Sequence, residues 1–225
     1  MSRTASAAMP HPHRDRGIEG RMAAWYAANT GKSGQPFQEL AQRIARELPH
    51  GGRILEVAPG PGYLSIELAR LGPFQVTGLD LSPDMVRIAG ENAKRAGVAI
   101  DFRQGNSSSL PFPPDSFDFL VCRAAFKNFA QPVRALQEMH RVLRPGGRAL
   151  IVDLRRNASP RDISQAVDAM GLTFVNRIVT KLTFRFLLLR SAYAREHIEQ
   201  MLVQTRFSHT RIDDGGIGFE IWLTK

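Results

Sequence analysis

The chain has 225 residues, of which 43% are hydrophobic and 23% are charged. This length suits one α/β domain and is short for two, and the balance of apolar and charged residues excludes disorder throughout. The formal net charge of +9 is compatible with an anionic partner but does not identify one, because an Arg-rich surface gives the same total. A single cysteine, Cys122, excludes an internal disulfide and a cysteine-rich zinc site.

The chain opens with residues 1–16, which are rich in Ser, Ala, Pro, His and Arg and lack apolar periodicity. We expect this stretch to be a disordered leader. Because we find no secretory signal pattern and no apolar run long enough for a bilayer, we expect a cytoplasmic protein. Helices are predicted next, over Met22–Ala28 and Phe37–Leu48, and the Pro and glycines at 49–52 end the second one.

From Arg53 onward, short β-branched runs alternate with helical patterns, which indicates βαβ units and a parallel sheet. The predicted strands are Arg53–Val57, Phe74–Leu79, Val98–Arg103, Phe117–Cys122 and Arg148–Leu154. The predicted helices between them are Tyr63–Leu71, Pro83–Ala96 and Pro132–Leu143.

The remaining segment is predicted to hold helices over Pro160–Met170 and Tyr193–Thr205, then strands over Phe207–Ile212 and Ile217–Thr224. The turn residues at 213–216 predict that these two strands form an antiparallel hairpin. We therefore expect one domain over residues 17–225, in which residues 157–190 form an insertion that lies over the domain like a lid.

A glycine-containing loop, Glu56-Val57-Ala58-Pro59-Gly60-Pro61-Gly62, follows the first predicted strand and opens a helix. Glycines at 60 and 62 let the backbone approach a ligand closely. Asp80 ends the next strand, 18 residues after Gly62, where a carboxylate can accept both hydroxyls of a ribose. The spacing predicts a nucleoside cofactor at this edge of the sheet.

The identity of the nucleoside follows from two departures from the dinucleotide pattern. Ser65 stands where the pattern G-x-G-x-x-G has its third glycine, and Glu56 gives the pattern E-x-x-x-G-x-G instead. From about Arg53 to Leu154, the chain resembles the class I S-adenosylmethionine (SAM)-dependent methyltransferases of the small-molecule branch. It is similar in particular to the ubiquinone/menaquinone-biosynthesis C-methyltransferases.

This resemblance implies a Rossmann-like α/β fold with a seven-stranded, mostly parallel sheet, an antiparallel last hairpin and helices on both faces. It also implies SAM as the cofactor. Asn106 stands where the family usually has an acid that meets the adenine amine, and its side-chain carbonyl can accept the same hydrogen bond. The cofactor-binding residues that we expect are Glu56, Ala58, Gly60, Gly62, Asp80, Leu81, Met85, Asn106, Ser107 and Arg123.

Candidates for the chemistry on the substrate follow the fourth and fifth strands. The segment Cys122–Phe129 is similar to the part of the quinone C-methyltransferases in which a basic residue precedes an Asn. Lys127 is therefore expected to hold an anionic oxygen of the substrate and Asn128 to orient it; alternatively, Lys127 is a solvated loop charge and Asn128 caps the turn. Asp153 is a candidate base or hydrogen-bond anchor. No metal site is expected.

Aromatic residues on two predicted helices are candidates for the substrate pocket or its lid. Related enzymes cover SAM with an N-terminal helix, so Trp25 and Tyr26 are expected either at the pocket or in the core beneath it. Tyr193 shares a helical face with His197, and that face either lines the pocket or supports the last strands.

The basic character of the later part of the chain bears on its partners. Residues 155–211 contain ten Lys or Arg and four Asp or Glu, and residues 177–190 mix basic with bulky apolar side chains. We expect this segment to cap a pocket for an apolar or phenolic molecule, to touch a membrane surface, or to bury its apolar face in the core. No nucleic-acid partner is expected, because no base-stacking platform is recognisable.

Taken together, these features predict a SAM-dependent methyltransferase that acts on O or C of a small molecule. Two alternatives stay open: a nucleotide-linked oxidoreductase, and a binding module that keeps the SAM fold without catalysis.

Overall fold

The computed structural model describes residues 17–30, 34–168, 178, 180–182 and 189–225. The expected leader at 1–16 and most of the 169–188 segment lie outside the described residues. Within them, no helix is long and apolar enough to cross a membrane.

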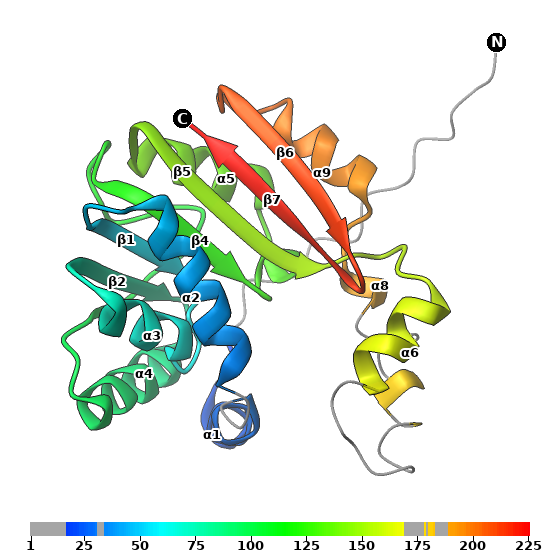
Figure 1. Ribbon diagram of the computed structural model, residues 1–225, viewed down its shortest axis with the longest axis horizontal. Helices are drawn as coiled ribbons and strands as arrows, with labels where there is room; N and C mark the ends of the chain where they lie inside the picture. The colour runs from blue at the N-terminus through cyan, green and yellow to red at the C-terminus, as the bar shows by residue number, and fades with distance from the viewer. Residues whose placement is uncertain (1–16, 31–33, 169–177, 179, 183–188) are drawn as a thin grey trace.

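The centre of the molecule is one seven-stranded sheet with the strand order β3-β2-β1-β4-β5-β7-β6 (Figure 1). Strands β1 to β5 are parallel to one another, and β7 is antiparallel to both β5 and β6. The predicted fold class is therefore confirmed, including the antiparallel last hairpin. The strands are β1 (Gly52–Val57), β2 (Phe74–Asp80), β3 (Asp101–Gln104), β4 (Phe117–Arg123), β5 (Leu143–Leu154), β6 (His209–Gly215) and β7 (Gly218–Thr224).

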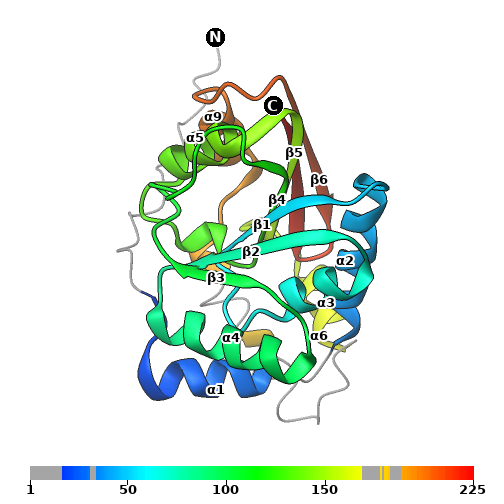
Figure 2. The ribbon, with the colours of Figure 1, turned by 90° about the vertical axis from the view of Figure 1, so that its left-hand side faces the viewer.

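Helices cover both faces of the sheet, as Figure 2 shows. One apolar cluster joins α2 and α3 to one face of the central strands, and a larger cluster joins α5 and α9 to the other face. The helices are α1 (Gly20–Thr30), α2 (Gln35–Glu47), α3 (Tyr63–Leu71), α4 (Pro83–Ala96), α5 (Pro132–Val142), α6 (Pro160–Asp168), α8 (Leu189–Ser191) and α9 (Arg195–Leu202), with a 3₁₀ turn at Phe126–Asn128.

The starts of two strands, β3 and β5, differ most from the prediction. Strand β3 begins at Asp101 instead of Val98, because the Val98 N–H donates to the carbonyl of Ala93 at the end of α4. Strand β5 begins at Leu143 instead of Arg148, since Leu143 already pairs with Phe117 before the register shifts. The predicted end of the preceding helix is confirmed within one residue.

The C-terminal elements also shift by a few residues. Helix α9 begins at Arg195, and Tyr193 lies before it in an isolated bridge with Arg155. The hairpin turn lies between Gly215 and Gly218, so that the two aspartates predicted in the turn belong to β6.

Candidate active site

A cavity of about 700 Å³ lies at the carboxyl ends of the parallel strands. The loops after β1, β2, β3 and β4 contribute most of its lining; the segment before α1, the start of α2, Leu154 at the end of β5 and Ser191 of α8 contribute the rest. This is the place where open α/β sheets bind their ligands, because the loops diverge there.

The loop after β1 is shaped by two residues in the left-handed region. Ala58 has φ +58° and Gly60 has φ +54°, and both line the cavity. A non-glycine residue in this region is strained, and such strain persists only where neighbouring bonds impose it. Here the Ala58 N–H donates to the carbonyl of Leu79 at 2.8 Å, so β2 holds the loop in place.

Asp80 ties the loop after β1 to the start of α4. Its Oδ2 accepts from the N–H of Gly60 at 2.9 Å, and its Oδ1 accepts from the N–H of Ser82 at 2.9 Å. Each oxygen retains capacity for a further hydrogen bond. Burial raises the pKa of Asp80, and its backbone hydrogen bonds oppose that rise. The carboxylate is thus prepared to accept hydroxyl donors from the cavity, which it lines.

Glu56 is a second carboxylate at the same end of the cavity. Its side chain is buried and accepts a hydrogen bond from the hydroxyl of Ser65. Burial raises the pKa of Glu56 to about 7, against the lowering effects of Ser65 and of the charge of Arg123. The serine that replaces the third glycine of the dinucleotide pattern therefore has a positive role, because it orients Glu56.

Gly62 does not line the cavity, in contrast to the expectation that it lets the backbone approach a ligand. It precedes α3 with φ +80°, and a Cβ built on it would lie 2.8 Å from Cζ of Phe102 and 3.0 Å from Cβ of Ala89. The glycine is needed because β3 and α4 pack closely against the start of α3.

The remaining cofactor candidates come from the segment after β2 with the start of α4, the loop after β3 and the end of β4. Oδ1 of Asn106 accepts from the N–H of Ser108 at 2.8 Å, so the oxygen expected to face an adenine also holds its own loop. All of the following line the cavity: Leu81, Met85, Asn106, Ser107 and Arg123.

Arg123 shows a contact that the sequence did not reveal. Its guanidinium carbon lies 4.5 Å from the centroid of the Phe37 ring, and Phe37 lies 5.7 Å from the ring of Tyr63. Both aromatic residues line the cavity. The position of Phe37 at the start of α2, directly after Pro36, was the only available signal, and it does not indicate which strand the helix covers.

Lys127 and Asp153 form a buried ion pair between the ends of β4 and β5. Nζ of Lys127 donates to Oδ1 of Asp153 at 2.9 Å and to the carbonyl of Ala124 at 2.8 Å. The side chains are 10% and 0% exposed, so Lys127 is not the solvated loop charge that the sequence left open. Lys127 lines the cavity together with Asn128.

The structure contradicts the expectation that Asp153 is a candidate base. It is not among the residues that line the cavity, and its oxygens accept from Nζ and the backbone N–H of Lys127 and from the N–H of Leu154. A carboxylate that is enclosed and hydrogen-bonded in this way is a positioning group, because it cannot touch a substrate. Of the two roles left open, the anchor fits.

The aromatic candidates lie elsewhere. Trp25 is 62% exposed and outside the cavity lining, so it is neither a pocket residue nor a core residue; the side chain of Tyr26 lies outside the described part. Tyr193 is buried 5.8 Å from Phe126 in the core, away from the cavity lining, where it supports the α5–α9 face. From the N-terminal region, Gly17 and Ile18 line the cavity instead.

The residues present fit a cationic nucleoside cofactor. Two buried carboxylates, Glu56 and Asp80, stand at one end of the cavity, where a positively charged ligand relieves the cost of their burial. Within the described residues no cluster of three His, Cys, Asp or Glu could hold a metal ion.

Comparisons with known proteins agree with this fit. Residues 55–151 match the family model of a methyltransferase domain. Over 117 residues the chain is 38% identical to the demethylmenaquinone methyltransferase of Deinococcus radiodurans, covering 51% of this chain and 48% of that protein. Over 168 residues it is 31% identical to the ubiquinone/menaquinone biosynthesis C-methyltransferase of Pseudomonas putida, covering 70% of this chain and 65% of that protein.

The fold has a close counterpart among solved structures. The crystal structure of a candidate S-adenosyl-L-methionine-dependent methyltransferase from Methanococcus maripaludis superposes with a TM-score of 0.77 at 22% identity, covering 94% of this chain and 95% of that one. The chain spans about half the length of the first curated relatives that it matches. These matches show that residues 55–151 are a methyltransferase domain and that the chain has the fold of a SAM-dependent methyltransferase.

Proposed function

We propose that the chain transfers a methyl group from SAM to an oxygen or carbon atom of a small apolar or phenolic molecule. The observation that carries this proposal is that the two ends of the cavity differ in charge. Its β1–β2 end presents the carboxylates of Glu56 and Asp80, and its β4 end presents Lys127 beside apolar residues such as Phe129 and Leu154. A cationic methyl donor fits the first end, and an electron-rich acceptor fits the second.

At the acidic end, Asp80 would hold the ribose hydroxyls and Glu56 would face the positive charge of the methionine portion. Gly60, Ala58, Leu81, Met85, Asn106 and Ser107 would complete the cradle, and Arg123 would meet the carboxylate of the methionine portion. When bound, SAM supplies a methyl group that its sulfonium makes electrophilic. The protein needs no covalent catalyst of its own for such a transfer.

At the other end, Lys127 would bind an oxygen of the acceptor. The bonds to Asp153 and Ala124 use two of the three N–H groups of its ammonium, and the third can serve a ligand in the cavity. Asn128 would orient the same acceptor. Holding acceptor and donor near contact can itself supply on the order of 7–11 kcal/mol of barrier lowering.

The names of the relatives support a small-molecule acceptor, since those proteins are named for quinone-related molecules. We propose no nucleic-acid partner and a cytoplasmic location, where the single cysteine would stay reduced. Burial also raises the pKa of that thiol well above its usual range, so Cys122 is unsuited to act as a nucleophile.

The proposal is tested by incubating the protein with SAM labelled in its methyl group and a panel of phenols, quinols, thiols and lipids. We expect label in a phenolic or quinol product. Binding of SAM without transfer to any acceptor would favour the non-catalytic module, and binding of a nicotinamide nucleotide in place of SAM would favour the oxidoreductase.

A further inference from the structure

The exposed apolar residues of this protein are not scattered over its surface. Within the described residues, seven large hydrophobic side chains are exposed, and five of them lie on two short segments, residues 18–25 and 178–182. We call these five the apolar rim: Ile18, Met22, Trp25, Ile178 and Leu182. Both segments lie at the lower end of the molecule in Figures 1 and 2.

The first segment is α1 and the residues before it. On its inner face, Ala23 and Ala27 pack on Met85 and Ile88 of α4. The outer face carries Met22 and Trp25, each 62% exposed. A helix that buries two alanines and exposes a methionine and a tryptophan inverts the usual pattern, which indicates that the outer face has a partner.

Hydrogen bonds fix this segment over the cavity. The Ser82 hydroxyl donates to the carbonyl of Ile18 at 2.7 Å, and the N–H of Gly20 donates to Oδ2 of Asp84 at 2.7 Å. Near the other end of α1, the Tyr63 hydroxyl donates to the carbonyl of Ala27 at 2.9 Å. This half of the rim therefore has a defined position, and its Ile18 lines the cavity.

The second segment belongs to the insertion after β5. Ile178 is 45% exposed and Leu182 is 51% exposed, so these two side chains do not bury an apolar face in the core. The base of the insertion adjoins the cavity, because Leu154 before it and Ser191 after it both line the cavity. Of the rim itself, Ile18 lines the cavity, and the insertion that carries Ile178 and Leu182 starts and ends near lining residues.

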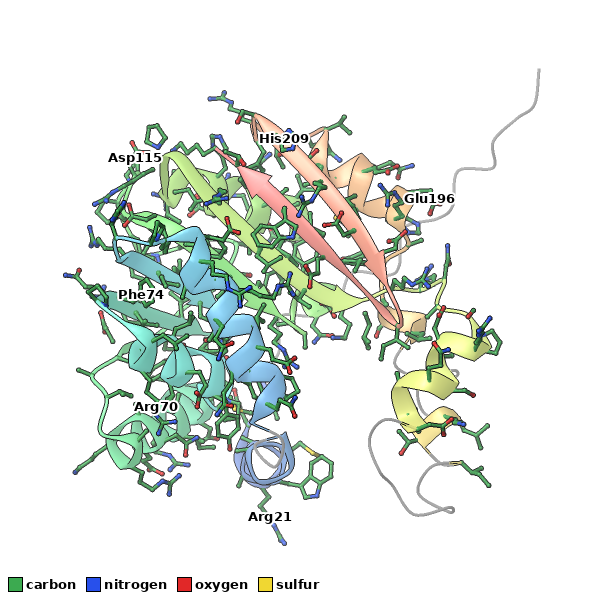
Figure 3. All side chains as sticks on the ribbon, in the orientation of Figure 1. Arg21, Arg70, Phe74, Asp115, Glu196 and His209 are labelled. Carbon is green, nitrogen blue, oxygen red and sulfur yellow. The ribbon has the colours of Figure 1, made fainter. Side chains whose placement is uncertain are left out.

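Charge indicates the nature of the partner. Residues 177–190, the segment that contains Ile178 and Leu182, hold four basic residues and no acidic one, and Lys181 pairs with Asp168 of α6 at 3.0 Å. Arg21 on α1 points away from the molecule (Figure 3). Apolar side chains that include a tryptophan, set among basic residues, are the pattern of a surface that lies in the interface of an anionic bilayer.

We propose that the apolar rim docks the protein on an anionic lipid surface with the cavity facing the bilayer. The proposal goes beyond methyl transfer and does not depend on it. It explains how an apolar acceptor would reach the cavity, since a molecule dissolved in the bilayer would enter between the two segments of the rim.

The chain offers its own reporter for this contact. It contains two tryptophans, and a Trp222→Phe variant leaves Trp25 as the single one. This variant, without SAM or acceptor, is mixed at low salt with vesicles of phosphatidylcholine alone or with one part in three of phosphatidylglycerol. We expect flotation with the anionic vesicles, a blue shift of the Trp25 emission, quenching by brominated acyl chains, and release at high salt.

Matched substitutions separate the rim from general adsorption. Met22→Ser together with Leu182→Ser is expected to weaken vesicle binding by at least tenfold, because both apolar side chains would leave the lipid. Leu71→Ser and Val203→Ser, which change exposed apolar residues outside the rim, are expected to leave binding unchanged.

Several results would overturn the proposal. The first is that the protein does not float with anionic vesicles at low salt. The second is that it floats without a shift or quenching of the Trp25 emission. The third is that the control variants lose as much binding as the rim variant. A blue shift of Trp25 that depends on protein concentration without vesicles, with a dimer in sedimentation, would show that a second copy covers the rim instead.

Discussion

At the scale of single residues, the site depends on charged groups that the sheet removes from water. Glu56, Asp80, Lys127 and Asp153 are all buried, and each has at least one hydrogen-bond partner within the fold. Buried charges without such partners would cost several kcal/mol. At the acidic end of the cavity, Glu56 and Asp80 place two buried negative charges close together. A cationic ligand can balance these charges.

The first prediction concerns the pH dependence of cofactor binding. With a pKa of about 7, Glu56 gains a proton as the pH falls below 7, and its neutral form attracts a cation less. SAM affinity should therefore rise with pH through 7, on the order of tenfold from pH 5.5 to pH 7.5. Isothermal titration at several pH values measures this.

The variant Glu56→Gln provides the control for this titration. Its affinity for SAM should be weaker and nearly flat between pH 5.5 and 7.5. If the affinity of the variant still rises with pH, the proton belongs to another group. Asp80 is then the nearest candidate, because burial raises its pKa as well.

The second prediction concerns the buried ion pair. Lys127→Met leaves the carboxylate of Asp153 without its ammonium partner, which should lower the free energy of unfolding by about 3–5 kcal/mol. It should also lower kcat by roughly a hundredfold, because the acceptor loses its oxygen ligand. Urea titration and methyl-transfer kinetics measure the two effects.

A double variant distinguishes the two roles of this lysine. Lys127→Met with Asp153→Asn removes both charges, and it should recover much of the lost stability while kcat stays low. Recovery of both stability and kcat in the double variant would mean that Lys127 only supports the fold.

At the scale of elements, the sequence predicts the bounds of a helix accurately where capping residues, proline or glycine mark its ends. The ends of α3 and α4 were predicted without error. Pro83 is the first residue of α4, the Ser82 hydroxyl accepts from the N–H of Met85, and Gly97 ends the helix with φ +70°. The starts of β3 and β5 were wrong by several residues, because a strand begins where its pairing with the neighbouring strand begins, and that pairing is not local.

The third prediction concerns Gly62, whose conformation and packing both exclude a side chain. Gly62→Ala should lower the free energy of unfolding by roughly 2–4 kcal/mol, from the positive φ and from the contacts with Phe102 and Ala89. Gly97→Ala is the matched control, because Gly97 has a similar φ of +70° and open space around its Cβ position. It should cost about 1 kcal/mol. Equal losses in urea titrations would show that packing at Gly62 has no effect.

At the scale of the whole molecule, the strand order explains what the sequence could and could not predict. The glycine loop and Asp80 were predicted because they follow consecutive strands, β1 and β2, which lie side by side. The Lys127–Asp153 pair joins residues 26 positions apart, and the Arg123–Phe37 contact joins β4 to the start of α2. Neither contact has a local signal, since both depend on which strands and helices become neighbours.

The central claim is that the acidic end of the cavity binds SAM through Asp80, and isothermal titration of SAM into the wild-type protein and Asp80→Ala tests it most directly. Asp101→Ala, which changes an exposed carboxylate on β3, serves as the control. The account predicts that SAM binds the wild type and the control alike and binds Asp80→Ala more than tenfold more weakly, with all three proteins folded by circular dichroism. Equal affinity in folded Asp80→Ala, or no binding of SAM to the wild type, would contradict it.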